Sequence, residues 1–589
     1  MKLSTYVAHF LRNLGIRHVF AVSGGASIHL IHSLSDTPGI NYICTHHEQA
    51  GAMAADAYSR ITRNLGAAVA TSGPGATNMI TGVAGAYYDS VPVIYITGQV
   101  STFRMKRDTG VRQLGFQETE TVEAFKPFTK YSVLVDDAQM IRYELEKAVH
   151  IATIGRPGPV LVDIPDNIQR EEVDPHELQG FVPNPSQVHG TELSATLDKC
   201  LKLLSQAQRP VLIVGWGVRL AKADDLITDI VRKLGIPVLP TWGAKDMFPS
   251  DDPLTVGVFG THGTRYGNFA VQNADLVIAI GARIDTREAG SPITTFARSA
   301  KKIIVDIDSS ELEKFETLGL KVDIAVNVDA KPFLEMLDSQ IDQEPFCDVQ
   351  DWLDRIAQWK LAYPVCLPEY YEENEVNPYV FMKSLSAVVP AGSVVVVDTG
   401  CAIAWAMQSF DVKARQRILH DFNNTAMGYA LPASIAAALA TKGQNVICIS
   451  GDGSLQMNVQ ELATIAKHAL PVKIFLLNNH GHSMIRQTQD QWLDSNYFGS
   501  SIEGGLGFPD FVKLAEAYGI PAIEIHKNSA IDLTLSRVLE HAGPMLCNVE
   551  VRPEHSVTPQ VKFGRPIEDS EPLLKRSEFY SNMITKPIS

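Results

Sequence analysis

The chain has 589 residues, of which 45% are hydrophobic and 20% charged, and its formal net charge is −15. This length predicts about three or four domains, because a single hydrophobic core does not grow so large. An acidic chain without a basic tract argues against a nucleic-acid partner and against an anionic membrane surface. The seven cysteines include no C-x-x-C pair, and no stretch is apolar enough to span a membrane. We therefore expect a cytoplasmic protein without a disulfide framework or a zinc site.

Three stretches of the chain alternate short apolar runs with segments of helical spacing. They cover residues 1–170, 191–345 and 376–550, and the alternation predicts a doubly wound parallel sheet in each. Residues 171–190 are Pro-rich and non-periodic, which is typical of a linker. Residues 346–375 contain an acidic, aromatic connector, and the tail, residues 551–589, is expected to wrap over a neighbour. The sequence thus predicts an α/β protein of three domains and a tail.

In the first domain, a β-type run leads into Glu48, and a helix of small residues follows it. A glutamate at a strand-to-helix junction is often only stabilised by the helix dipole, but with partial burial it also suits proton transfer. His29 and His32 lie one helical turn apart after Gly25 and Ala26. Their pattern fits solvated helix histidines as well as it fits a proton-handling pair.

In the third domain, two apolar runs flank a helical segment between residues 446 and 477, and each run ends in a polar cluster. Such a strand–helix–strand unit places both clusters at the carboxyl edge of a parallel sheet, where ligands bind. The first cluster is Gly451-Asp452-Gly453, and the second contains Asn479. Oxygen donors among glycines suit a Mg²⁺ that also holds phosphate oxygens. An ordinary β-turn with an Asn-rich helix cap is the alternative.

These motifs resemble the signature of thiamine-diphosphate (ThDP) enzymes, and residues 71–100 are similar to acetolactate synthase almost throughout. The resemblance covers nearly the whole chain. It implies that Glu48 activates ThDP at its pyrimidine ring, that Gln117 faces the reacting carbons and that His482 helps to handle protons. The metal ligands that it implies are Asp452, Asn479 and the backbone carbonyl of Gly481.

The same resemblance implies a ThDP site and a substrate pocket. Met427 would force the cofactor into a bent shape, and it is equally suited to core packing. Where the family usually has Gln-His this chain has Cys401-Ala402, so only backbone contacts carry over there. The implied ThDP residues are Pro74, Asn78, Gly400, Cys401, Ala402, Thr425, Met427, Gly451, Gly453 and Ser454. The implied substrate pocket consists of Gly25, Ala26, Phe116, Met484 and Thr488, with His29 and His32 beside it.

In acetolactate synthases the central domain binds FAD, which takes no redox part in the main reaction. The matching glycines would let the backbone approach a pyrophosphate, the arginines would neutralise it, and Asp306 would accept from a ribose or adenine group. The family's three consecutive glycines are here Gly215-Trp216-Gly217, and Trp216 either stacks on the cofactor or blocks it. The implied FAD positions are Arg156, Gly215, Gly217, Thr241, Gly260, His262, Gly281, Arg283, Asp285, Arg287, Asp306 and Asp329.

The resemblance implies ThDP- and Mg²⁺-dependent decarboxylation of a 2-oxo acid, pyruvate, and ligation of the two-carbon unit to a second carbonyl. Biosynthetic acetolactate synthases carry Trp where this chain has Thr488 and Lys where it has Asp166, so its acceptor side is wider and less welcoming to a carboxylate. Acetyl transfer to a ketone, such as a nucleotide-linked keto-deoxysugar, is therefore a close alternative. A ThDP-FAD hydrolase of cyclic diketones and a non-catalytic cofactor-binding regulator are lesser alternatives. A homodimer or homotetramer with active sites between subunits is also implied.

Overall fold

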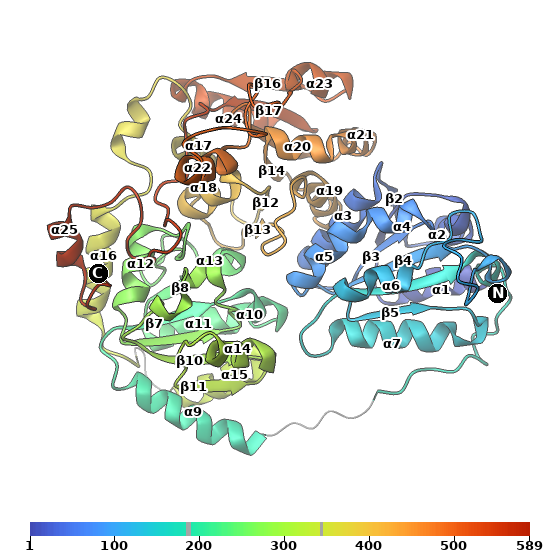
Figure 1. Cartoon of the computed structure of the whole chain (residues 1–589), viewed down its shortest axis with the longest axis horizontal. Coiled ribbons are helices and arrows are strands. Elements are labelled where there is room, and N and C mark those ends of the chain that lie inside the picture. The colour runs from blue at the N-terminus through green and yellow to red at the C-terminus, as the bar shows by residue number, and fades with distance from the viewer. Residues whose placement is uncertain (184–189, 342–345, 589) are drawn as a thin grey trace.

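The computed structural model of the chain describes residues 1–183, 190–341 and 346–588. Its strands form three sheets, and hydrogen-bonded neighbours within each sheet run parallel, which confirms the predicted α/β class with three doubly wound sheets (Figure 1). Residues 184–189 of the expected linker lie outside the described residues. The three blocks surround a common centre, with the first block on the right of Figure 1, the middle block at the lower left and the third block at the top.

The first block contains a six-stranded sheet in the order β2-β1-β3-β4-β6-β5. Its strands are β1 (His18–Ala21), β2 (Asn41–Cys44), β3 (Gly66–Ala70), β4 (Val93–Gln99), β5 (Tyr131–Leu134) and β6 (Val160–Pro165). Its helices are α1 (Leu3–Asn13), α2 (Ile28–Asp36), α3 (Glu48–Thr62), α4 (Pro74–Asn78), α5 (Ile80–Tyr88), α6 (Thr121–Phe125), α7 (Ile141–Thr153) and α8 (Asp166–Gln169).

The middle block contains a five-stranded sheet in the order β11-β10-β9-β7-β8. Its strands are β7 (Pro210–Val214), β8 (Val238–Pro240), β9 (Leu276–Ile280), β10 (Lys301–Asp306) and β11 (Ile324–Asn327). The helices here are α9 (Gly190–Leu204), α10 (Trp216–Leu220), α11 (Asp224–Leu234), α12 (Arg265–Asn273), α13 (Thr286–Ala289), α14 (Ser309–Thr317), α15 (Ala330–Gln340) and α16 (Gln350–Ala362).

The third block contains a six-stranded sheet in the order β13-β12-β14-β15-β17-β16. Its strands are β12 (Val394–Val397), β13 (Arg417–Leu419), β14 (Val446–Gly451), β15 (Val472–Asn478), β16 (Ala522–Ile525) and β17 (Met545–Glu550). The helices are α17 (Pro378–Val388), α18 (Cys401–Ser409), α19 (Ala430–Ala440), α20 (Asp452–Met457), α21 (Leu462–Lys467), α22 (Ser483–Trp492), α23 (Phe511–Ala517), α24 (Ile531–Glu540) and, in the tail, α25 (Arg576–Asn582).

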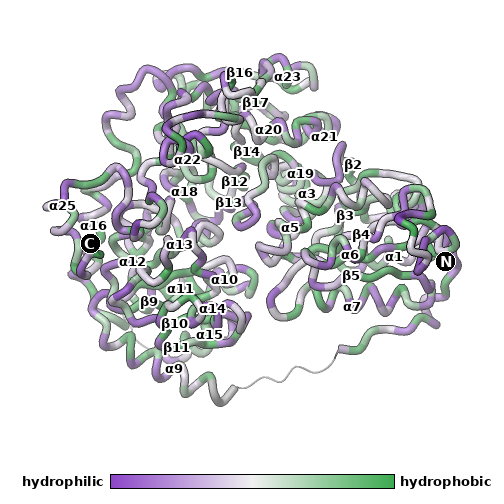
Figure 2. Tube along the Cα trace, in the orientation of Figure 1, coloured by the Kyte–Doolittle hydropathy of each residue, from purple (hydrophilic) through white to green (hydrophobic). Residues whose placement is uncertain are grey.

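The hydrophobic cores lie along these sheets, as expected of strands that are covered on both faces. In Figure 2 the apolar residues run along the strands and the adjacent helix faces, while many of the connecting loops are hydrophilic. One core joins two blocks, because helix α3 of the first block packs against α19 of the third through small residues such as Ala54 and Ala433. Within the described residues, no helix has the length and apolarity needed to cross a membrane.

The tail packs over the middle block of its own chain (Figure 1). There it provides hydrogen-bond partners for the buried polar side chains of one helix. Helix α12 buries Arg265, Asn268, Gln272 and Asn273, and each of these side chains bonds to a tail residue between 567 and 585. Buried polar groups need such partners. Before the expected connector, helix α16 buries an apolar stripe of Trp352, Ile356 and Trp359 against the middle block.

A buried charge network joins the blocks around Arg60, which is 4% exposed. Its guanidinium donates to Asp56 at 2.8 Å and to Asp89 at 2.8 Å. Asp56 also accepts from the hydroxyl of Tyr429 in the third block, at 2.6 Å. Asp89 accepts from the backbone N–H of Phe422 at 2.8 Å, so one cation fixes two helices of the first block to the third block.

Replacing Arg60 with Met should destabilise the protein by about 3–5 kcal/mol, because it leaves buried carboxylates without their cation. The measurement is the shift of the thermal unfolding transition. Arg232→Met is the matched control, since Arg232 pairs with Asp229 where both side chains are more than 60% exposed, and such pairs contribute little. Equal transitions for the two variants would contradict the assignment of the network as a structural joint.

Candidate functional site

The carboxyl ends of β14 and β15 form a cradle of oxygen donors. The two strands pair in parallel with Gly451 opposite Leu477, so Asp452 and Asn479 emerge at one edge of the sheet. Asp452 accepts from the backbone N–H of Gly481 at 3.1 Å, and burial raises its pKa to about 6. The Oδ1 atom of Asn479 is buried and has no hydrogen-bond partner. A hard cation would satisfy both groups, so the residues present fit the implied Mg²⁺.

The loop after β12 adds backbone donors to this edge. Gly400 has φ +84°, a left-handed conformation that favours glycine, and helix α18 begins at the next residue, Cys401. Cys401 is buried and its pKa is raised to about 12 by desolvation, so its thiol stays protonated at neutral pH. The N-terminus of a nine-residue helix suits a diphosphate.

Asp398 holds this loop to the segment that contains Met427. Its carboxylate accepts backbone N–H groups from Thr399 at 2.9 Å, Gly428 at 3.0 Å and Ala430 at 3.0 Å. Met427 itself lies between Thr425, with φ +49°, and this anchor. Asp398 is fully buried, and its bonds to the backbone that follows Met427 fix the position of this bulky side chain.

Two of the expected residues, His482 and Met427, converge on Gly453. A Cβ added there would lie 2.2 Å from Cε1 of His482 and 3.3 Å from Cε of Met427. Any side chain at this position would have to displace the His482 ring. Desolvation lowers the pKa of His482, with Arg486 adding to the effect, so the imidazole is neutral at neutral pH. Ser454 follows on helix α20 and hydrogen-bonds toward Asp398.

The segment after the metal cradle is held by Arg486. Its guanidinium donates to the backbone carbonyls of Asn479, at 3.2 Å, and His480, at 2.8 Å. Met484 and Thr488 lie one turn apart on α22, and the Thr488 hydroxyl donates to the Met484 carbonyl at 3.1 Å. The Thr488 hydroxyl is thus hydrogen-bonded within its own helix.

The first block carries the second half of the site. Glu48 begins helix α3 at the end of β2, and Asn78 donates to its Oε2 at 2.9 Å. Pro74 begins the neighbouring helix α4 and is exposed, as is Asn78. A Cβ added at Gly75 would lie 3.2 Å from Oε1 of Glu48, so this glycine leaves room for the carboxylate.

The expected substrate-pocket residues of the first block lie beside this glutamate. Ala26 donates its N–H to the hydroxyl of Thr71 at 3.2 Å, on the strand end that leads to α4. Gln117 has φ +63° and packs against Gly73, where an added Cβ would lie 3.0 Å from its carbonyl oxygen. Phe116 is 85% exposed on the same loop, and Gly25 is exposed as well.

The two helix histidines differ in their surroundings. His29 is partly buried, and desolvation lowers its pKa, with Arg170 and Lys2 adding to the effect and Asp166 opposing it. His32 is 70% exposed and lies 3.3 Å from Asp36 on the same helix, away from Glu48. His29 is thus placed near Asp166, whose carboxylate accepts from the Ser101 hydroxyl.

Among the described residues, no hydrogen bond or ion pair joins Glu48 or Asn78 to Met427, Asp452 or Asn479. The first and third blocks of the chain are bonded elsewhere, as where the His46 N–H donates to Glu461 at 2.9 Å. Glu48 itself is half-buried.

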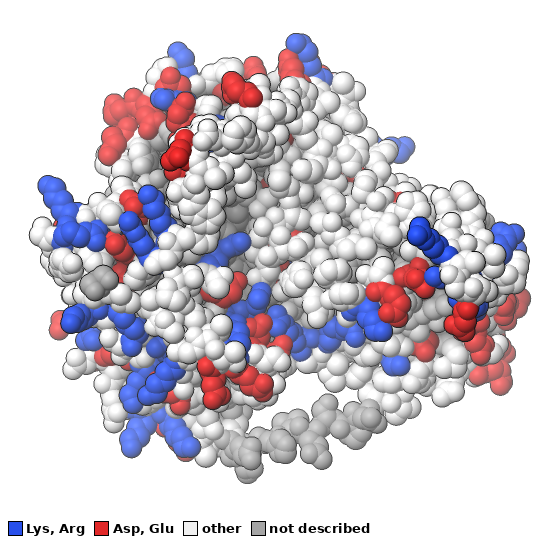
Figure 3. Space-filling model, viewed as in Figure 1, with Lys and Arg blue, Asp and Glu red and all other residues white. Residues whose placement is uncertain are grey.

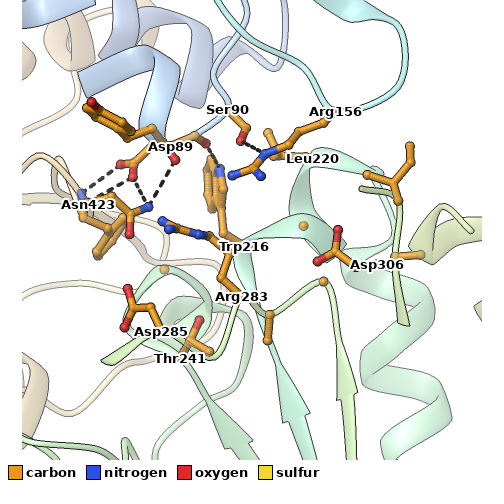
Figure 4. Close-up of a pocket in the computed structure, with 18 of the residues that line it drawn as sticks. Asp89, Ser90, Arg156, Trp216, Leu220, Thr241, Arg283, Asp285, Asp306 and Asn423 are labelled. Carbon is orange, nitrogen blue, oxygen red and sulfur yellow. Dashed lines mark hydrogen bonds between the residues drawn. The ribbon is translucent and has the colours of Figure 1, made fainter. Parts of the chain in front are cut away.

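A separate cavity lies where the three blocks meet. All of the expected FAD positions except Gly215 and Gly260 line it, with the first block supplying Ser90 and Arg156 and the third block Phe422 and Asn423 (Figure 4). Lys and Arg side chains border the seam between the first and middle blocks in Figure 3, among acidic ones, although the whole chain is acidic. The position of the cavity between domains and its cations suit a dinucleotide.

Gly215 and Gly260 lie behind the cavity wall, where they allow backbone segments to pack closely. A Cβ at Gly215 would lie 2.1 Å from the Gly281 carbonyl oxygen, and one at Gly260 would lie 2.4 Å from that of Arg287. Trp216 lines the cavity, and its indole N–H donates to the Asp89 carbonyl at 3.0 Å (Figure 4). The indole is therefore tethered to the first block and leaves the cavity open beside it.

Sequence reasoning missed three residues that fix the backbone at these sites. They are Asp398 and Arg486 at the diphosphate edge and Asp89 at the cavity. Each has a backbone partner that is distant in the sequence, namely Gly428 for Asp398, Pro553 for Arg486 and Phe422 for Asp89. No local motif indicates such a partner. The only available signal was an acidic residue directly after an apolar run, as at Asp398.

The chain is similar to known proteins along most of its length. Residues 1–124, 197–337 and 398–549 match the N-terminal TPP binding domain, the central domain and the C-terminal TPP binding domain of thiamine pyrophosphate (TPP, the same compound as ThDP) enzymes. Acetolactate synthase 2, chloroplastic, of Zea mays is 35% identical over 577 residues, covering 96% of this chain and 88% of the relative. The acetolactate synthase large subunits of Parasynechococcus marenigrum and Cyanidium caldarium are 36% and 34% identical over 94% and 96% of this chain, and over 88% and 96% of their own lengths.

Replacing Asn479 with Leu should weaken the binding of ThDP in the presence of magnesium by at least about tenfold, because it removes a metal oxygen donor at nearly constant volume. Calorimetric titration of the full chain measures the affinity. Asn496→Leu is the control, since Asn496 is exposed on the same block and bonds only within its own turn. Unchanged affinity in the Asn479 variant would remove this residue from the metal site.

Proposed function

The chain belongs to the thiamine pyrophosphate enzyme family, and from that premise we propose that it decarboxylates pyruvate and joins the two-carbon unit to a second carbonyl. The observation that carries the proposal is the unpartnered Asn479 oxygen beside Asp452, together with Gly453 closely approached by Met427 and His482. This arrangement has the donors that a metal-bound diphosphate needs. It also has a bulky side chain positioned where a bent cofactor would contact it.

Asp452, Asn479 and the Gly481 carbonyl would hold the metal, and the α18 N-terminus would bind phosphate oxygens. When bound, ThDP supplies the ring that accepts the electrons left by departing CO₂. Glu48, oriented by Asn78, would exchange a proton with the pyrimidine ring. Gln117 would hydrogen-bond at the reacting carbons, and the neutral His482 would accept and donate protons there.

We also propose that FAD occupies the cavity between the blocks without taking a redox part in this reaction. Arg156 and Arg283 reach the cavity from opposite blocks, and both pair with Glu311. These arginines would meet the pyrophosphate, while Asp306 and Asp329 at the ends of β10 and β11 would accept from the ribose and adenine.

A second acceptor class is favoured by Asp166. Its carboxylate lies beside Ser101 and His29 at the first-block end of the expected substrate pocket. A fixed negative charge there disfavours a 2-oxo acid acceptor and suits hydroxyl groups that donate hydrogen bonds. A neutral or hydroxylated ketone, including a nucleotide-linked keto-deoxysugar, is therefore the alternative acceptor.

Incubation with pyruvate alone, and then with pyruvate and a ketone or keto-sugar, should separate the two acceptors when the products are identified by mass. Glu48→Gln should reduce CO₂ release by at least about a hundredfold, because it removes the acid–base group. Asp166→Lys should raise the share of acetolactate among the products. Fast acetolactate formation with no ketone adduct would reject the ketone acceptor, and full CO₂ release from the Glu48 variant would reject the mechanism.

We propose that a complete site needs two copies of the chain, with Glu48 of one copy facing the metal cradle of the other. Glu48→Gln and Asp452→Ala should each be inactive, yet co-expressed and purified as a mixed dimer through different tags they should regain activity. The purified mixed dimer should regain about half of the activity, because one of its two sites carries both substitutions and the other carries neither. Absence of recovery in a verified mixed dimer would place both groups in one chain.

A further inference from the structure

Glu288 is one of the acids that line the cavity. Its carboxyl has a backbone hydrogen bond to Asp285, just as Asp89, Asp285, Asp306 and Asp329 each accept at least one backbone N–H. The Oε2 atom of Glu288 is buried and has no partner among the described residues. A buried polar atom without a partner is costly in a folded protein unless something outside the chain satisfies it.

The charges around Glu288 do not compensate for its burial. Burial raises the pKa of Glu288 most, and the charge of Asp285, which caps the same short helix, raises it further. Arg283, Lys314 and the backbone hydrogen bond to Asp285 lower that pKa by less. Arg287 is directed elsewhere, with its guanidinium 5.0 Å above the Trp242 ring and donating to the Phe422 carbonyl. Together these effects raise the pKa of Glu288 to about 8, so its carboxyl is protonated at neutral pH.

The cavity around Glu288 is aromatic. Its backbone lies against Gly260, where an added Cβ would be 2.9 Å from the Glu288 Cα. The ring of Trp242 lies 6.2 Å from that of His262, and Phe422 closes the cavity from the third block. Burial lowers the pKa of His262 to about 4, so it adds no positive charge. This part of the cavity suits a flat, neutral ring.

We infer that Glu288 hydrogen-bonds, as a carboxylic acid, to the imide edge of a flavin ring bound in this cavity. A protonated carboxyl presents one donor and one acceptor side by side, which matches the adjacent C=O and N–H groups of an imide. A carboxylate presents acceptors alone and would repel the imide oxygens. The inference rests on the proposed FAD and adds which residue recognises the ring.

The test measures flavin affinity with the flavin-stripped, full-length protein. Fluorescence quenching gives the dissociation constant of FAD between pH 7 and pH 9 for the unchanged chain and for Glu288→Gln and Glu288→Ala. Glu316→Gln is the matched control, because Glu316 is an exposed acid on the neighbouring helix α14. ADP, bound in competition with FAD, reports the adenosine end of the cavity separately.

For the unchanged chain and the Glu316 variant, FAD affinity should fall about tenfold between pH 7 and pH 9, because the acid form is lost above a pKa of about 8. Glu288→Gln keeps a donor and an acceptor and cannot ionise, so its affinity should be independent of pH. Glu288→Ala should bind FAD about tenfold more weakly at pH 7, and ADP affinity should be unaffected throughout.

A pH dependence that is identical in the unchanged chain and Glu288→Gln would overturn the role of Glu288, while leaving FAD binding in place. Equal affinity of Glu288→Ala and the unchanged chain at pH 7 would do the same. Failure of the unchanged chain to bind FAD at any pH would overturn the inference and the proposed flavin together. The carboligase proposal is tested separately by its products.

Discussion

One buried guanidinium, that of Arg60, holds the arrangement on which both sites depend. It pairs with Asp56 and Asp89, and these acids in turn bond to the third block through Tyr429 and the backbone of Phe422. Taking an ion pair out of water is costly, and the hydrogen bonds to Tyr429 and the backbone of Phe422 help to offset that cost. The network thereby fixes the first block against the third, and two of its members, Asp89 and Phe422, line the cavity between the blocks.

The same network connects the cavity to the diphosphate edge. Phe422 and Asn423 line the cavity, and the chain reaches Met427 a few residues later. The segment between is fixed by Asp421, which accepts the Ala426 N–H at 3.1 Å, and by Asp398 beyond Met427. A ligand in the cavity thus touches the start of the segment that shapes the proposed cofactor site. The two sites are linked by a short run of backbone rather than by a long path through the core.

Much of this fold could be predicted from the sequence, because strands buried on both faces read as apolar runs, and glycines and polar residues at their carboxyl ends indicate ligands. Residues 446–450 and 472–477 fall within β14 and β15 on this basis. Asp89 bonds to a residue 333 positions away, a distance at which no periodicity operates. The sequence could not predict that one carboxyl oxygen of Glu288 is buried without a partner, because such burial depends on packing alone.

The tail has a consequence for the stability of the middle block. Arg265 donates to the carbonyls of Ser570 and Pro572, and Asn273 donates to the carbonyl of Asn582. Val561, Ile567 and Phe579 of the tail also belong to the hydrophobic core of the middle block. Without the tail these polar side chains would lose partners and that core would lose apolar contacts. The middle block therefore depends for its stability on a segment that follows the third block in the sequence.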